Sequence, residues 1–332
     1  MKSSLLRFLK VLVGLLLTTL AIWLSFRNID WPLLSASLSK ISWAWVLLAL
    51  ANVVFSVYAL GWRWRILLDP KDRISMKALF RWNVLSQYVN ILMPARFGEV
   101  FRAYVGSRES RISAAFSIGT VAVERIFDFF VFAVLWLIIP VLFSIKEQVR
   151  GSVYALFFSV LMVALLCLSI LQPAFFLKTI DVFSGLLPQK IRPSIRGFFE
   201  EALEAFKILR RPIRFFSILG LTAFFLIGQI LTNFFLFKAY HFSLSFWASL
   251  FLLLVVQVGN VPPSAPGKIG IFEYAVILAL SVFGVSKSQA LSYGIMLHLV
   301  AFLPKIILGM FFISSIDLRA LKRENKTLES KA

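Results

Sequence analysis

The sequence has little of what most soluble enzymes use for chemistry. It holds one cysteine and two histidines in 332 residues, and only 15% of its residues are charged. A metal site built from His and Cys is therefore not expected, and Cys167 has no second cysteine for an internal disulfide. No G-x-x-x-x-G-K-[ST], H-E-x-x-H or G-x-S-x-G motif occurs. We expect no metal, no cofactor, no ATP-driven step and no recognised enzymatic activity.

Long polar stretches are also scarce, whereas apolar runs are abundant. Hydrophobic residues make up 60% of the chain, against about half in soluble proteins. Runs of about 20 apolar residues, the length that spans a bilayer, recur along the sequence. This predicts an all-α, polytopic helical membrane protein. Full spans are predicted near 8–26, 42–62, 117–145, 152–172, 214–238 and 289–315, and two interrupted segments near 82–104 and 245–284.

The net charge of +19 comes from basic residues scattered between these segments. Lys and Arg collect in cytoplasmic loops and near anionic head groups, so this excess indicates topology. A nucleic-acid surface is not expected, because the charges form no single patch. The rule places both termini, the stretch from Arg63 to Arg81 and residues 173–212 on the cytoplasmic side of the cell membrane. Residues 173–212 also show helical amphipathic spacing, which predicts an interfacial helix with its apolar face in lipid.

The two interrupted segments place proline and glycine within apolar sequence. The first contains Pro94 and Gly98, and the second contains Pro263, Gly267 and Gly270. Lipid tolerates irregular backbone only where protein buries it or where it lines a wet cavity. The charge topology makes both segments re-entrant hairpins that enter from opposite faces.

The order span, hairpin, span therefore occurs twice, near 42–145 and 214–315. We assign both copies to one domain, residues 1–318, followed by a short basic tail, 319–332. Such inverted repeats are typical of secondary transporters.

Three charged residues lie in the predicted span 117–145. Glu124 and Asp128 share one helix face, and Arg125 can pair with Asp128 three residues on. Charged groups inside a membrane are costly and usually paired or functional. Two interpretations stay open: a structural ion pair that docks helices, or a head-group or proton site facing a central cavity.

Charged residues also flank both breaks. Arg96, Glu99 and Arg102 surround a helix start, where free N–H groups, the helix dipole and arginine forks would suit a phosphate; the alternative is ordinary cytoplasmic-side charge. Glu273 begins a half-helix, either as a first-turn acid or as a ligand for an ammonium group or a proton. His298 is a candidate proton-coupling residue or a packing residue.

These motifs together resemble a known family. Pro94-Ala-Arg96-Phe-Gly98-Glu99, with Glu124-Arg125-Ile-Phe-Asp128 further on, is similar to the first signature of the flippase-like membrane family, which includes the transmembrane flippase region of lysylphosphatidylglycerol synthases. Pro266-Gly267-Lys-Ile-Gly270-Ile-Phe-Glu273 resembles its second signature. The family often has Arg where this chain has His298. The resemblance implies the stand-alone membrane module, without the synthase domain.

The sequence therefore predicts a transporter that moves a phosphate-bearing lipid between leaflets of the cytoplasmic membrane. The candidate substrates are an aminoacylated or zwitterionic phospholipid and a polyprenyl-phosphate lipid. Arginines 96, 102 and 125 would attract the phosphate, and the carboxylates of residues 99, 124, 128 and 273 would bind a cationic group or exchange protons. The alternatives are a membrane enzyme or accessory subunit in lipid-linked glycan or glycolipid assembly, and a scaffold with an ion-pair core. The expected partners are the bilayer, its lipids and a separate lipid-modifying enzyme or glycosyltransferase.

Overall fold

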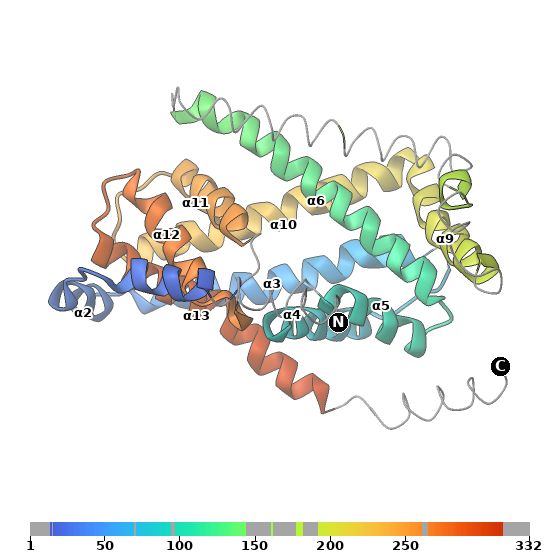
Figure 1. The fold of residues 1–332 in the computed structure, drawn as a ribbon, viewed down its shortest axis with the longest axis horizontal. Coiled ribbons are helices and arrows are strands. Elements are labelled where there is room, and N and C mark those ends of the chain that lie inside the picture. Colours follow the sequence, from blue (N-terminus) through green and yellow to red (C-terminus); the bar gives the residue numbers. More distant parts are fainter. Residues whose placement is uncertain are drawn as a thin grey trace.

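The computed structural model describes residues 14, 16–69, 71–93, 97–143, 161, 177–181, 192–260 and 265–314. Regular structure in these residues is helical, with no strand, which confirms the predicted all-α membrane fold (Figure 1). Three helices are long and apolar enough to cross a membrane: α3 (Trp43–Leu68), α10 (Pro212–Ala239) and α13 (Lys287–Ile313). A fourth long helix, α6 (Ala114–Phe143), carries the acidic and basic residues singled out above.

The remaining elements are shorter. They are α2 (Trp31–Ser39), α4 (Met76–Leu92), α5 (Phe97–Glu109), α9 (Arg192–Lys207), η2 (Ile208–Arg210), α11 (Phe246–Gly259), η3 (Pro266–Lys268) and α12 (Ile271–Ser281). An apolar helix also runs over Leu16–Phe26, the described part of the predicted first span. Most of the predicted span 152–172 lies outside the described residues, as do Pro94, Arg96 and Pro263.

Both interrupted segments fold as pairs of packed helices. In the first, α4 packs on α5, and a Cβ on Gly98 of α5 would overlap the carbonyl oxygen of Ser86 on α4. In the second, α11 packs on α12, and a Cβ on Gly259 would lie 2.7 Å from the Cβ of Ala275. A glycine at each crossing therefore lets the two backbones approach closely. We call these pairs the first and second hairpins.

The long helices α3 and α10 run antiparallel along most of their length (Figure 1). The N–H of Ser42 at the start of α3 donates to the carbonyl of Ala239 at the end of α10 over 3.0 Å. Towards their other ends, Arg63 Nη1 donates to Thr222 Oγ1 over 3.1 Å. A two-fold axis that exchanges two antiparallel helices is perpendicular to them, and for helices that span a bilayer it lies in the membrane plane. Both α3 and α10 are long and apolar enough to span one.

The other contacts between helices follow the same two-fold relationship. The first hairpin's α4 packs on α13, as the second hairpin's α11 packs on α6. Similarly, α5 packs on α6 as α12 packs on α13, and α3 packs on α13 as α10 packs on α6. This is the packing of an inverted repeat. The exact limits proposed for the two repeats and for the basic tail stay predictions.

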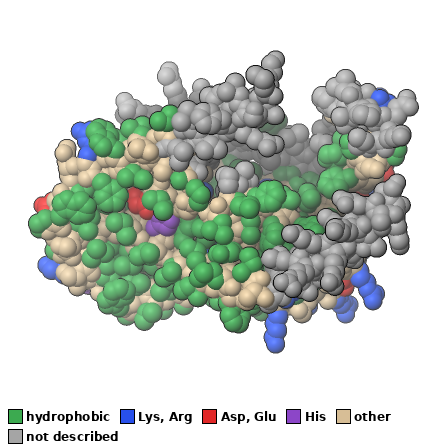
Figure 2. Space-filling view, turned by 60° about the horizontal axis from the view of Figure 1, so that its bottom comes forward, with side chains coloured by type: hydrophobic (Ala, Val, Ile, Leu, Met, Phe, Trp, Pro, Cys, Tyr) green, Lys and Arg blue, Asp and Glu red, His purple; other side chains and the backbone are tan. Residues whose placement is uncertain are grey.

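Each hairpin has its own hydrophobic core. One core joins the first half of α3 and the second half of α10 to α11, α12 and α13. The other joins the second half of α3 and the start of α10 to α4, α5, α6 and α9. The outer surface is apolar as well. Figure 2 shows a face covered mainly by hydrophobic side chains, with Lys and Arg near its ends, as expected of a surface in lipid.

The amphipathic helix predicted within 173–212 is present as α9, but its apolar face is not simply in lipid. Phe206 is buried, and α9 packs on α6, where a Cβ on Gly119 would overlap the backbone of Ala202. Only Phe198 and Phe199 on this face stay exposed. The lipid-facing prediction is therefore wrong for the second half of the helix, because α6 covers it.

Candidate functional site: a buried charge cluster and a Glu–His pair

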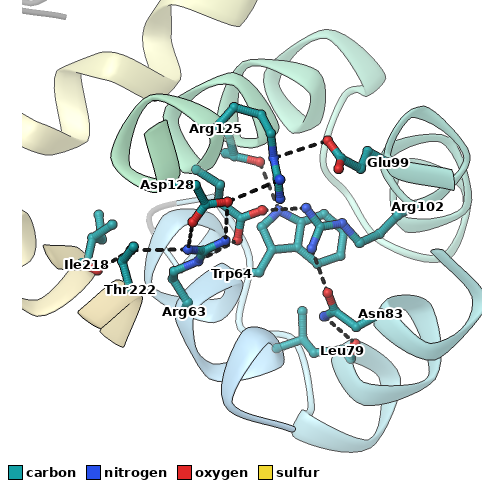
Figure 3. A network of polar contacts seen from close by, with 12 residues as sticks. Arg63, Trp64, Leu79, Asn83, Glu99, Arg102, Arg125, Asp128, Ile218 and Thr222 are labelled. Carbon is teal, nitrogen blue, oxygen red and sulfur yellow. Dashed lines mark hydrogen bonds and ion pairs between the residues drawn. The ribbon is translucent and has the colours of Figure 1, made fainter. Parts of the chain in front are cut away.

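The first hairpin and its flanking helices bring six charged side chains together (Figure 3). We call this set the charge cluster; it consists of Arg63, Glu99, Arg102, Glu124, Arg125 and Asp128. Its members come from α3, α5 and α6. Five of the six were predicted as site residues, and the structure brings those five together.

Glu124 is at the centre of the cluster and is fully buried. Its Oε1 accepts from Arg63 Nε over 3.3 Å, and its Oε2 accepts from Arg102 Nη2 over 2.5 Å. Arg63 also donates from Nη1 to Asp128 Oδ1 over 2.5 Å and to Thr222 on α10. The carboxylates of α6 therefore tie together α3, α5 and, through the hydroxyl of Thr222, α10.

Arg102 is held through its two terminal nitrogens and the face of its guanidinium group, while its Nε has no hydrogen-bond partner. Its Nη1 donates to Asn83 Oδ1 on α4 over 2.6 Å. Its guanidinium carbon lies 4.2 Å from the ring centroid of Trp64, whose Nε1 donates to Thr120 Oγ1 over 2.9 Å. A guanidinium over an indole face is a favourable cation–π arrangement. Arg102 is therefore both paired and stacked, with little freedom to turn toward a ligand.

The accessible edge of the cluster is Arg125. Its Nε lies 3.2 Å from Glu99 Oε2, and its Nη1 lies 3.1 Å from Asp128 Oδ2. Figure 3 shows Arg125 reaching toward Glu99 on one side and Asp128 on the other. The Arg125 side chain is 29% exposed, whereas that of Arg63 is 1% exposed. The predicted pairing of Arg125 with Asp128 is therefore present, and Glu99 shares the same arginine.

The cluster is electrically balanced, because its three arginines face three carboxylates. Removing one partner from a buried ion pair leaves an uncompensated charge, which costs about 3–5 kcal/mol. The cluster therefore holds the first hairpin to the bundle as well as offering charges to a ligand.

Arg63 is the member that sequence reasoning missed. Its place after the predicted span 42–62 suggested a cytoplasmic-side charge, but α3 continues to Leu68 and buries it. A signal was present: tryptophans stand on both sides of Arg63, and apolar residues continue to Leu68.

Glu273 and His298 form a second polar site, in the second hairpin. Glu273 Oε1 lies 2.5 Å from His298 Nδ1, and its Oε2 accepts from the Gly270 N–H over 2.6 Å. The rings of Phe272 and Phe302 lie 4.8 and 4.3 Å from the imidazole centroid. Within the part of the chain that the structure describes, no hydrogen bond or ion pair joins this pair to the charge cluster, so the predicted site residues form two groups.

The glycines predicted to shape the second break do so. Gly267 and Gly270 have φ angles of +72° and +84°, in the region that favours glycine. Gly270 also lies close to the N-terminal helix, where a Cβ would meet Ile22, and Ala265 N–H donates to Thr18 Oγ1 over 3.0 Å. The N-terminal helix thus packs directly on the second break.

The fold and these two sites define a polytopic helical membrane protein with an inverted pair of hairpins and buried charged side chains. The chain belongs to the family described as the lysylphosphatidylglycerol synthase TM region, whose match covers residues 11–309.

Two curated relatives come from Methanocaldococcus jannaschii. The UPF0104 membrane protein MJ1078 is 25% identical over 236 residues, which cover 71% of this chain and 97% of the relative. The UPF0104 membrane protein MJ1595 is 23% identical over 297 residues, covering 85% of this chain and 86% of the relative. No solved structure matches the chain.

Proposed function

We propose that the protein moves a phosphate-bearing lipid between the leaflets of the cytoplasmic membrane, with both termini on the cytoplasmic side. The charge cluster carries this proposal, because six charged side chains meet beside a hairpin of an inverted repeat. Charges within a membrane mark substrate or ion pathways, and inverted repeats with broken helices bind substrate where the repeats meet. The family's link to a lipid synthase supports a lipid-related task.

The head group would meet Arg125 and Glu99 first, because they form the accessible edge of the cluster. A guanidinium fork binds phosphate oxygens in bidentate fashion. A phosphate would therefore replace Glu99 as the partner of Arg125, and a cationic part of the head group would pair with the Glu99 carboxylate. This exchange keeps the site electrically balanced, and it favours a zwitterionic or aminoacylated phospholipid over an anionic polyprenyl phosphate.

The inner residues would have a different role. Arg63 and Arg102 hold Glu124 and Asp128 by direct contacts of 2.5–3.3 Å, with almost no exposure. They would keep the carboxylates in place while Arg125 changes partner. Because Glu99 lies on α5, its release from Arg125 would remove one of the two ion pairs that join α5 to α6 and leave the other, Arg102 with Glu124, in place. The first hairpin would then be held less firmly, which links head-group binding to gating.

The experiment is a lipid translocation assay in proteoliposomes of phosphatidylethanolamine and phosphatidylglycerol carrying a fluorescent (NBD) lipid of each class. Dithionite would report the fraction of label exposed outside. Wild-type protein should move the labelled phosphatidylethanolamine, and the Glu99→Gln, Arg125→Ala double variant should lose most of that movement. Arg196→Gln is the matched control, since it breaks an exposed ion pair on α9 away from the cluster.

The proposal is overturned if the double variant is as active as wild type in folded, reconstituted form. Mass spectrometry of the same lipids separates transport from catalysis. A changed mass would identify an enzyme of lipid-linked glycan or glycolipid assembly, and an unchanged mass with a changed leaflet supports the translocator.

A further inference from the structure

One of the contacts between each hairpin and the long helix that follows it lies at the same position in both repeats. Glu99 is the third residue of α5 and pairs with Arg125, the twelfth residue of α6, over 3.2 Å. Glu273 is the third residue of α12 and pairs with His298, the twelfth residue of α13, over 2.5 Å. The inverted repeat has therefore built the same acid–base contact twice.

The two contacts differ in one chemical respect. Arginine stays protonated at every physiological pH, whereas histidine changes charge between about pH 5 and pH 8. The first hairpin is thus held by a permanent ion pair, and the second by a contact that a proton can strengthen or weaken. A charge-assisted hydrogen bond is about twice as strong as a neutral one.

The Glu273 carboxylate also reaches the break itself. One oxygen contacts His298, and the other accepts from the N–H of Gly270, at the positive-φ turn that begins α12. A change at His298 is therefore passed to the backbone of the hairpin through a single side chain, that of Glu273. The aromatic rings of Phe272 and Phe302 lie against the imidazole, and the His298 side chain stays 15% exposed. Figure 2 shows one acidic and one histidine side chain next to each other within a largely hydrophobic face.

The surrounding helices offer Glu273 no competing acid. The elements packed on α12, α13 and the second break are the N-terminal helix Leu16–Phe26, α2, α3, α4, α10 and α11. Together with α12, α13 and η3, these described elements contain no carboxylate besides Glu273. The other charged or titratable side chains of these elements are Tyr58, Arg63, Arg65, Lys77, Arg81, Tyr88, Arg214, Lys238, Lys268, Tyr274, Lys287, Tyr293 and Lys305. A proton held in this contact is therefore held between Glu273 and His298.

We propose that Glu273 and His298 form a proton-operated latch on the second hairpin, for which Glu99 and Arg125 are the permanently charged counterpart. In the closed state His298 carries a proton and forms an ion pair with Glu273. When the hairpin opens, the imidazole loses its anionic partner and releases that proton to water, so opening becomes easier as pH rises. A cationic head group that pairs with Glu273 would replace His298, and one proton would leave as one cationic group enters. The proposal rests on the proposed function for this last step only.

The test measures hairpin opening without any lipid substrate. Cys167 is the only cysteine, so a Cys167→Ser background accepts spin labels at Leu278→Cys on α12 and Leu303→Cys on α13, both exposed. In nanodiscs of phosphatidylethanolamine and phosphatidylglycerol, the open population seen by pulsed electron resonance should rise about tenfold from pH 5.5 to pH 8.

Two variants sharpen the result. His298→Arg should keep the second hairpin closed at both pH values, and His298→Gln should open it equally at both. Labels at Val100→Cys on α5 and Phe129→Cys on α6, both exposed, report the first hairpin. That hairpin should be insensitive to pH in the wild type. In Arg125→His it should become sensitive, by less than the second hairpin, because Arg102 and Glu124 still join α5 to α6.

The latch is overturned if the open population of the second hairpin does not change with pH in the wild type. It is also overturned if that population still changes with pH in His298→Arg. If the protein moves lipid but the hairpin opens equally at both pH values, the latch is wrong and the proposed function is still supported. If the hairpin opens in a pH-dependent way but the protein moves none of the labelled lipids, the latch is supported and the proposed function is wrong.

Discussion

Arg63 on α3 donates to Glu124 on α6 over 3.3 Å, and neither side chain exposes more than 1% of its surface. The contact joins the two long helices that flank the first hairpin. Glu124 is also the acceptor for Arg102 on α5, so one carboxylate connects three helices. A charge placed this deeply is stable only while its partners stay.

Replacement of Glu124 by Gln tests this dependence. The variant removes the carboxylate that Arg102 contacts and one of the two that Arg63 contacts. We expect it to lower the free energy of unfolding by about 3–5 kcal/mol. Thermal unfolding in detergent measures the effect. Glu109→Gln is the control, because it removes a partly exposed partner of Arg81 and should cost less than about 1 kcal/mol. Equal melting temperatures for the two variants would contradict the central role of Glu124.

Arg63→Lys tests the shape of the guanidinium separately from its charge. Arg63 contacts Glu124, Asp128 and Thr222 at once, and an ammonium group on a single stem cannot reproduce that fork. We expect a loss of about 1–3 kcal/mol in unfolding free energy. Arg65→Lys, at an exposed position of the same helix, should change little, and a loss as large there would argue against the geometric explanation.

Gly98→Ala tests the close crossing of the first hairpin. The new methyl group would overlap the carbonyl oxygen of Ser86, and backbone cannot yield as a flexible side chain can. Overpacking of this kind costs about 1–3 kcal/mol. Gly197→Ala on α9 is the matched control, because nothing lies within 4 Å of its Cβ position. There alanine should stabilise the helix by up to about 1 kcal/mol, so the two melting temperatures should move in opposite directions.

The surface contact between Lys71 and Glu204 gives a pH-dependent prediction. Lys71 Nζ donates to Glu204 Oε2 over 2.7 Å, and this hydrogen bond holds the pKa of Glu204 below its ordinary value. A carboxyl whose pKa is lowered in the folded state adds stability above the unfolded pKa of about 4.3 and loses it as pH falls through the folded value.

Lys71→Gln should therefore lower the melting temperature slightly at neutral pH, with a cost below about 1 kcal/mol because both side chains are well exposed. The difference from wild type should vanish in acid. Lys77→Gln, at another exposed lysine near the start of α4, serves as the control. A difference that grows on acidification would contradict the assignment.

The sequence by itself determined the fold class and the position of both hairpins. Apolar runs long enough to span a bilayer predict the long helices, and prolines and glycines inside such runs predict the breaks, because lipid leaves irregular backbone few alternatives. It also singled out Glu124, Arg125 and Asp128, because charge is costly where hydropathy places membrane, and Glu99 and Arg102, because they flank a break at the start of a helix.

Apart from the pairing of Arg125 with Asp128 within α6, only the tertiary structure decided which charged side chains pair with each other. Arg63 looked like a loop charge, and it is buried because α3 extends past the predicted span and packs antiparallel on α10. The apolar face of α9 looked ready for lipid, and α6 covers part of it. Contacts such as Glu99 with Arg125 and Glu273 with His298 join residues on different helices, and their partners depend on how those helices pack, which local patterns in the chain do not encode.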